Sequence, residues 1–228
     1  MIRVRVRTSC LLTSFFCFAL LGCRTSANIL HTARNARAVA QSDSVRYQPY
    51  RQLLDQLATA DWQDRKAVFQ VFRLHGFRSP AADSANRWLL RQDSLRLRTF
   101  QAAERRYGWP RTSRVGAQGV QDAYLLVQHA PAPVHASYQD TLRATYERAD
   151  LSSPDYATYV DRVLLYQGQR QRYGTQSGRR VLATGQEEDY LLPVEELAAL
   201  DQRRATMQLK PLLPRLQPGT LVLKKEQK

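Results

Sequence analysis

Two polar residues in the second half of the chain have side chains that could do acid–base chemistry. His129 follows an apolar stretch and could act as a general base, because imidazole exchanges protons near neutral pH. It could equally be a buried histidine, or one stabilised at the C-terminal end of a helix. Asp161 could orient His129 and complete a pair of base and orienter. His129 and Asp161 are therefore the catalytic candidates.

Asp161 also has a structural interpretation. It falls within an apolar helical pattern, where a carboxylate needs a partner. Arg203 or Arg204, from a later element, could form a buried bidentate pair with it, and such pairs usually fix packing. The sequence leaves Asp161 open between this ion pair and a role beside His129.

A glycine-containing polar segment, residues 173–176, could bind a small ligand. It presents hydroxyl, amide and backbone groups on an expected loop, and loops held by a scaffold often carry binding. If this loop faces His129, the two could line one pocket; otherwise the loop is a turn that satisfies its own backbone. The ligand-binding candidates are Gln128, His129, Tyr173, Thr175, Gln176 and Arg203.

The stronger enzyme motifs are missing from the sequence. It contains no G-x-S-x-G elbow, no phosphate-binding glycine loop and no H-E-x-x-H motif. The histidines do not have the spacing of metal ligands, so neither a metal nor a cofactor is expected. These histidines are His31, His75, His129 and His135.

Helices must position most of the candidate residues. Tyr50, Leu53, Leu54 and Leu57 are spaced as one face of a helix that starts near Tyr47. Similar apolar faces recur along the chain, with glycines and prolines between them. This pattern predicts a succession of helices.

Two helix boundaries have clear local signals. A long helix should run through residues 88–107 and end at Gly108, because Pro110 forbids its continuation. Ser153-Pro154-Asp155 predicts a helix start, with a cap, a proline in the first turn and an acid at the positive end of the helix.

The pattern changes after that helix. Residues 172–182 indicate a short hairpin or an irregular loop, and a final helix should run from Pro193 to about Met207. The predicted fold class is mainly α: a compact multi-helix domain with at most one short β-hairpin. We expect a single helical domain over residues 47–218 and a disordered tail over residues 219–228.

The start of the chain resembles a bacterial lipoprotein signal peptide. Three arginines precede an apolar run, residues 11–21, that is too short to span a bilayer as a stable helix, and Gly22 and Cys23 follow. The resemblance implies cleavage before Cys23 and lipidation of its thiol. The alternatives are an ordinary signal peptide or a short membrane anchor. We expect a signal peptide at 1–22 and a lipid-attached cysteine with a flexible tether at 23–46.

The cysteines agree with an exported, lipid-anchored chain. Cys10, Cys17 and Cys23 are the only three, and all lie in or next to the apolar run. Cleavage before Cys23 would leave one cysteine, which carries the lipid. That excludes a disulfide, a thiolate metal site and Cys–His catalysis in the mature chain.

The formal net charge of +14 fits either nucleic acid or an anionic membrane surface. The basic residues are spread along the chain and do not form a stripe with interleaved aromatic residues. We therefore expect contact with anionic lipid headgroups and no binding of nucleic acid.

Several short motifs occur in a recognisable order. They are Gly108-Trp109-Pro110, Val115-Gly116, Gln128-His129-Ala130, Asp161-Arg162 and Tyr173-Gly174-Thr175-Gln176. Together they resemble an uncharacterised bacterial domain family with GWP, QHA, DR and YGTQ motifs, over residues 85–210. The family implies no activity. Pro131 stands where the family pattern has an acidic residue, so an acid that could have partnered the histidine is missing.

Two functions fit these observations. The first is a membrane-anchored lipoprotein of the bacterial cell envelope, on the periplasmic side, that is not an enzyme and binds a protein or a small molecule at the QHA and YGTQ motifs. The alternative is an envelope hydrolase with His129 as general base. The missing nucleophile and metal motifs favour the binding module.

Overall fold

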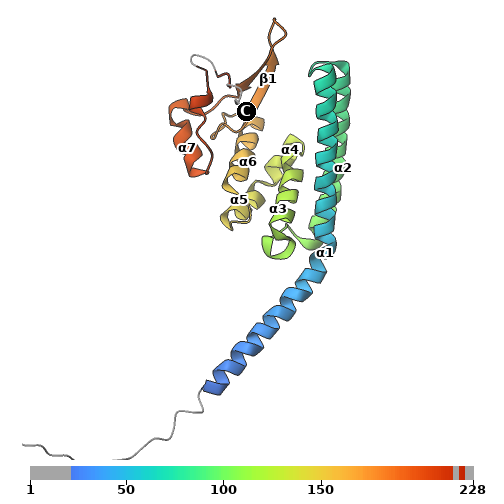
Figure 1. Ribbon diagram of the computed structural model, residues 1–228, viewed down its shortest axis with the longest axis vertical. Helices are drawn as coiled ribbons and strands as arrows, with labels where there is room; N and C mark the ends of the chain where they lie inside the picture. The colour runs from blue at the N-terminus through green and yellow to red at the C-terminus, as the bar shows by residue number, and fades with distance from the viewer. Residues whose placement is uncertain (1–21, 218–220, 224–228) are drawn as a thin grey trace, which may run out of the picture. The chain divides into compact units, whose positions relative to one another are not determined.

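The computed structural model describes residues 22–217 and 221–223, with side chains from Val45 onward (Figure 1). The expected signal peptide lies outside the described residues except for Gly22, and the side chain of Cys23 is not described. Of the expected tail at 219–228, only residues 221–223 are described. The chain divides into two units, with the boundary between Val45 and Arg46.

Helix α1 spans Gly22–His75 and crosses this boundary. Residues 24–46, expected to be a flexible tether, are therefore helical here, which fits their content of alanine and arginine, both good helix formers. Pro49 lies inside the helix and has no N–H to donate to the carbonyl of Val45, so one backbone hydrogen bond is lost at the unit boundary. No helix in the described part of the chain is both long and apolar enough to cross a membrane.

Helix α2, Pro80–Tyr107, lies beside the second half of α1 (Figure 1). Its start is capped by Ser79, whose hydroxyl accepts a hydrogen bond from the Ala82 N–H at 3.1 Å. It ends at Gly108, whose positive φ of 78° suits glycine. The predicted end of this helix is confirmed.

Four shorter helices follow: the first packs against α2, and the others pack against one another and against the first. They are α3 (Thr112–Gln128), α4 (Ala132–Ser137), α5 (Gln139–Glu147) and α6 (Ser153–Tyr166). The main core lies between these helices and α1–α2 and includes the fully buried Tyr50, Leu54, Phe100, Val127 and Leu142. The cap of α6 is Ser152, one residue before the predicted one.

The GWP motif is structural. Trp109 packs edge-on against Phe100 at 5.7 Å between ring centroids and lies 5.6 Å from the ring of Tyr138. The carbonyl of Gly108 accepts a hydrogen bond from the Tyr50 hydroxyl at 3.3 Å. The motif therefore joins the end of α2 to the core.

A small β-sheet follows α6. Strands β1 (Ser177–Val181) and β2 (Glu187–Leu191) pair antiparallel, with Arg179 opposite Asp189. The predicted hairpin exists, but its second strand lies beyond the expected residues 172–182. β2 is rich in charged residues, which are uncommon in strands, and this explains why the sequence pattern missed it.

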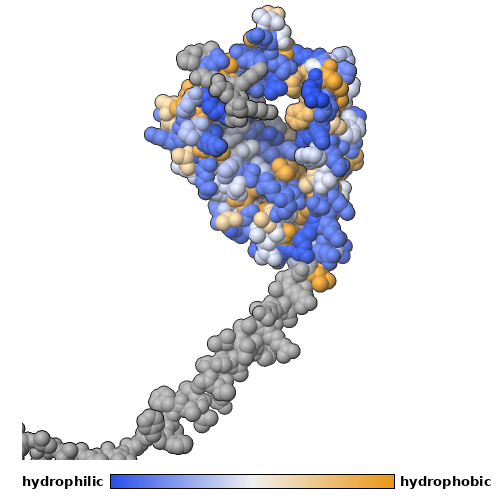
Figure 2. Space-filling model, viewed as in Figure 1, coloured by the Kyte–Doolittle hydropathy of each residue, from blue (hydrophilic) through white to orange (hydrophobic). Residues whose placement is uncertain are grey.

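The C-terminal part forms a second, smaller core. It contains a 3₁₀ turn (Leu197–Ala199), α7 (Leu200–Thr206) and a second 3₁₀ turn (Leu213–Arg215). The final helix thus starts later than the predicted Pro193. Within the described residues the fold is mainly α with a single two-stranded sheet, as expected. In the view of Figure 2 the described surface is mostly hydrophilic, with apolar residues scattered over it.

Candidate functional site

His129 lies at the C-terminal end of α3 and contacts α1. Its Nδ1 atom is 2.9 Å from a carboxylate oxygen of Asp61 and 3.0 Å from Nε of Arg65. A ring with its proton on Nε2 accepts the Arg65 Nε–H at Nδ1, whereas a ring with a proton on Nδ1 donates it to Asp61. Nε2 makes no hydrogen bond within the described residues, and the side chain is 21% exposed. A carboxylate therefore holds the ring and leaves the other nitrogen open to solvent.

Asp61 belongs to a larger charge network between α1 and α2. Arg65 bridges Asp61 and Asp93, at 3.1 and 2.9 Å, and Arg96 contacts Asp93 at 2.8 Å. Arg96 also pairs with Asp64 of α1. Burial alone would raise the pKa of Asp61, but the hydrogen bonds and charges of His129 and Arg65 lower it below its ordinary value. The network fixes the position of His129 relative to both long helices.

Arg162 of the DR motif joins the other two polar motifs. Its Nη1 donates to the Gln128 carbonyl at 2.6 Å, and its Nη2 and Nε donate to the Gln176 side-chain oxygen at 3.1 and 3.3 Å. The residue next to His129, helix α6 and the YGTQ loop therefore meet at one guanidinium. We call His129, Arg65, Arg162 and Gln176 the His129 cluster.

Asp161, the neighbour of Arg162, is fully buried and does not orient His129. Its carboxylate accepts hydrogen bonds from the N–H groups of Arg172 and Tyr173, at 2.7 and 2.9 Å. It also accepts from the N–H and hydroxyl of Thr175, at 2.9 and 2.8 Å. The carboxylate that lies beside His129 is Asp61.

The expected ion pair of Asp161 with Arg203 or Arg204 is wrong. Arg203 donates to the carbonyls of Arg172 and Glu195, at 2.7 and 2.5 Å. Arg204 donates to the carbonyls of Tyr173 and Lys210, both at 2.7 Å. The acid and the arginines hold the same loop through different backbone groups, because Asp161 accepts from its N–H groups and the arginines donate to its carbonyls.

The remaining candidates divide into two groups: Gln176 and Thr175 are connected to the His129 cluster, whereas the side chains of Tyr173 and Gln128 make no hydrogen bond to it within the described residues. Gln176 belongs to the His129 cluster, and Thr175 connects it to Asp161, since its oxygen accepts from the Gln176 side-chain amide at 3.1 Å. Tyr173 lies near Tyr156: burial raises the pKa of Tyr156, and Tyr173 adds to this. The Gln128 side chain is buried and has no hydrogen-bond partner among the described residues.

Sequence reasoning missed Asp61, Arg65 and Arg162 as members of the site. Asp61 and Arg65 are separated by four residues on one helix, a spacing that predicts a pair on the helix surface but not contact with His129. Arg162 belongs to the DR motif, and its positive charge next to Asp161 was the signal in the sequence that could have identified it as a site residue. No group of three or more acids, histidines or cysteines in the described residues could hold a metal.

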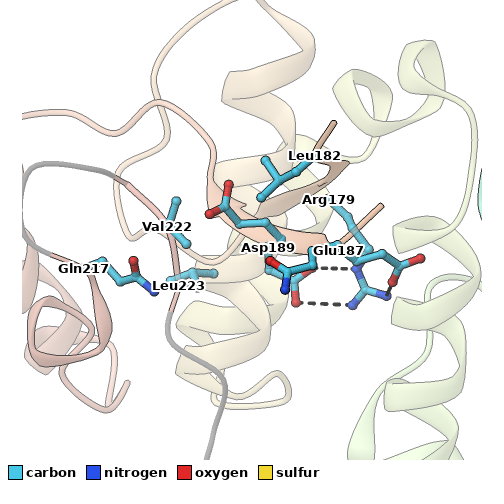
Figure 3. A pocket seen from close by; sticks show the side chains of 9 residues that line it. Arg179, Leu182, Glu187, Asp189, Gln217, Val222 and Leu223 are labelled. Carbon is cyan, nitrogen blue, oxygen red and sulfur yellow. Dashed lines mark hydrogen bonds and ion pairs between the residues drawn. The ribbon is translucent and has the colours of Figure 1, made fainter. Parts of the chain in front are cut away.

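A separate cavity of about 710 Å³ lies between the hairpin and three residues near the C-terminal end of the described chain, Gln217, Val222 and Leu223 (Figure 3). Its arginine, Arg179, is paired with Asp189 at 2.6 Å and with Glu187 at 3.5 Å. None of the sequence-predicted site residues lines it. The paired charges leave this cavity without a free cation among its lining residues.

Comparison with known proteins identifies a domain family. Residues 51–217 match the model of a family of unknown function, DUF6624. No curated protein and no solved structure matches the chain.

Proposed function

The chain belongs to the DUF6624 family of unknown function, so we propose its function from its own residues: a membrane-anchored binding module of the cell envelope whose His129 cluster takes a small ligand. The observation that carries the proposal is the convergence of three separate motifs on Arg162, beside a histidine with an open nitrogen. Loops and helix ends held by a rigid scaffold are common places for binding.

The surroundings of the cluster favour recognition over simple packing. Asp61 contacts the ring of His129 at Nδ1, and Asp161 holds the loop that carries Gln176. Both acids are at least nine-tenths buried, whereas His129 and Arg65 are 21% and 25% exposed in their side chains. The supporting residues are inside and the residues with open polar atoms reach solvent, as a binding site requires.

A ligand screen by thermal shift tests the binding proposal. We expect compounds that raise the melting temperature of the full chain to lose this effect in His129→Ala, because a ligand stabilises only the protein that binds it. The matched control is His75→Ala, an exposed histidine at the end of α1. Retained ligand effects in His129→Ala, or a melting temperature that collapses without ligand, would instead make His129 part of the scaffold.

The anchoring part of the proposal rests on the resemblance of residues 1–23 to a lipoprotein signal. Lipid on Cys23 would place the module at the membrane on the periplasmic side, near anionic headgroups that attract its basic surface. Cells that express wild type and Cys23→Ala should differ in acyl label and in membrane fractionation. Equal label and equal fractionation of the two would refute the anchor.

One observation favours the alternative, a hydrolase. The 2.9 Å contact between Asp61 and Nδ1 of His129 is the geometry of a general base with its orienter. In that case Asp61→Asn should reduce turnover of an envelope ester or amide while leaving binding intact. A wild-type chain that binds such a compound without turning it over would contradict the hydrolase and leave binding as the proposed function.

A further inference from the structure

We propose that the ligand of the His129 cluster presents an oxyanion, a phosphoryl or carboxylate group, to Arg162, Arg65 and the open nitrogen of His129. The inference rests on the proposed function and names the class of ligand for the same site. It follows from the charges and unused hydrogen-bond donors of the three residues.

Arg162 carries a positive charge with no neutralising partner in the described residues. Its hydrogen bonds go to a backbone carbonyl and to the amide oxygen of Gln176, which are both neutral acceptors. The ion pairs of the described residues include none with Arg162. Nη1 and Nη2 each keep an N–H group that no described residue uses.

Arg65 adds a second set of unused donors. Its Nε and Nη2 atoms bind Asp61 and Asp93, but Nη1 makes no hydrogen bond within the described residues. Burial lowers the pKa of Arg162, and repulsion from the positive charge of Arg65 lowers it further. An anion near both would remove this repulsion.

His129 lies between the two arginines along the hydrogen-bond network. Its ring contacts Arg65, and the carbonyl of the residue before it contacts Arg162. Because Asp61 fixes the Nδ1 side, Nε2 is the atom that faces a ligand. A protonated imidazole would present a further N–H to the anion.

The donor set selects the chemistry of the ligand. A guanidinium is planar and presents paired N–H groups that match two oxygens of a carboxylate or a phosphate. The site is formed by a few half-buried side chains, which suits the terminal group of a small molecule. Arg162 contrasts in this respect with Arg65, Arg96 and Arg179, whose charges are taken up by aspartates of the chain itself.

The variant Gln176→Glu tests this directly. It keeps the shape of the side chain and an oxygen for Arg162, but it supplies the missing negative charge inside the protein. We expect inorganic phosphate and acetate to raise the melting temperature of the full chain more than chloride does at equal ionic strength. In Gln176→Glu the anion affinity should fall by about tenfold or more, since the site already holds a carboxylate.

Two further variants make the test specific. His129→Gln leaves Arg162 and its partners in place, and it should also weaken phosphate binding by about tenfold. The matched control is Gln52→Glu, the same change at an exposed position of α1, which should bind like wild type. If Gln176→Glu fails to fold, His129→Gln still decides the matter.

The outcomes separate this inference from the proposed function. Wild type that responds to phosphate and acetate no more than to chloride overturns the oxyanion, while a neutral compound that needs His129 in the ligand screen would still support the binding module. Unchanged phosphate affinity in both variants also overturns it. If vesicles of phosphatidylglycerol bind wild type but not Gln176→Glu, the phosphate is that of a lipid headgroup. If both proteins bind the vesicles equally while Gln176→Glu loses inorganic phosphate binding, the ligand is a soluble molecule.

Discussion

Asp161 holds a loop through backbone groups instead of an ion pair. Its carboxylate oxygens collect three N–H groups and one hydroxyl from residues 172–175. This loop turns at Gly174, where a positive φ of 63° and close contact with Leu200 and Leu212 suit glycine. Asp161 therefore determines where Gln176 meets Arg162.

Replacement of Asp161 should be severely destabilising. Asp161→Ala leaves three part-buried N–H groups without this acceptor, and a fully buried group left unsatisfied costs about 1–3 kcal/mol. We expect a loss of roughly 3 kcal/mol or more in chemical denaturation. The control is Asp140→Ala, whose side chain is 89% exposed, with an expected change within about 0.5 kcal/mol. Similar small changes for both variants would contradict the geometry of the loop.

His135 makes stability depend on pH. It is fully buried, with Nε2 at 2.9 Å from the Ala130 carbonyl, and its Nδ1 has no partner among the described residues. Burial first, with the charges of Arg162 and His129, lowers its pKa to about 4 from 6.5. The unfolded chain gains a proton below pH 6.5 and the folded protein does not until about pH 4.

The free energy of unfolding should therefore decrease as the pH falls through this window, by at most about 1.4 kcal/mol per pH unit from this residue. His135→Phe keeps a ring beside Tyr159 and removes the titrating group. Denaturation curves of both proteins at several pH values give the contribution by difference. An equal pH dependence of wild type and variant would show that His135 is already protonated or exposed.

At the scale of elements, α1 and α2 are joined by buried charges as well as by apolar contacts. Arg96 is 7% exposed in its side chain and lies among Asp61, Asp64 and Asp93. Although burial opposes its charge, Asp64 and Asp93 raise the pKa of Arg96 above its ordinary value. The network is complete only when both helices are present.

Replacement of Arg96 should lower the free energy of unfolding, because it removes ion pairs that join α1 and α2. Arg96→Met keeps the length of the side chain but leaves the aspartates without this partner, and breaking a buried pair costs about 3–5 kcal/mol. Arg98→Met, at an exposed position of the same helix, is the control. The measurement is urea denaturation of both variants. A nearly neutral Arg96→Met would mean that the aspartates are protonated or solvated.

The sequence predicted elements better than contacts. The end of α2 was predictable because Gly108 and Pro110 are local signals, and the helical class followed from the spacing of residues such as Tyr50 and Leu54. The contact of Asp61 with His129 was not, because 68 positions separate them and no local pattern links them. The partners of Asp161 were missed because they are backbone groups, which residue types do not reveal.

At the scale of the whole molecule, the described domain brings the four residues of the His129 cluster together from separate elements. Helix α1 supplies Arg65, the C-terminal end of α3 supplies His129, and α6 with the loop that follows it supplies Arg162 and Gln176. Three helices and a loop therefore bring together residues that are more than a hundred positions apart in sequence. In the proposed function, the lipid on Cys23 would keep this site at the membrane surface.

A crystal structure of the full chain grown with phosphate tests the central claim most directly. We expect an anion in contact with the unused N–H groups of Arg162 Nη1 and Nη2, with Nη1 of Arg65 and with Nε2 of His129. Crystals of Gln176→Glu grown under the same conditions should show the new carboxylate paired with Arg162 and no anion at the His129 cluster. Phosphate found only at other arginines, with the His129 cluster unchanged in wild type, would contradict the account.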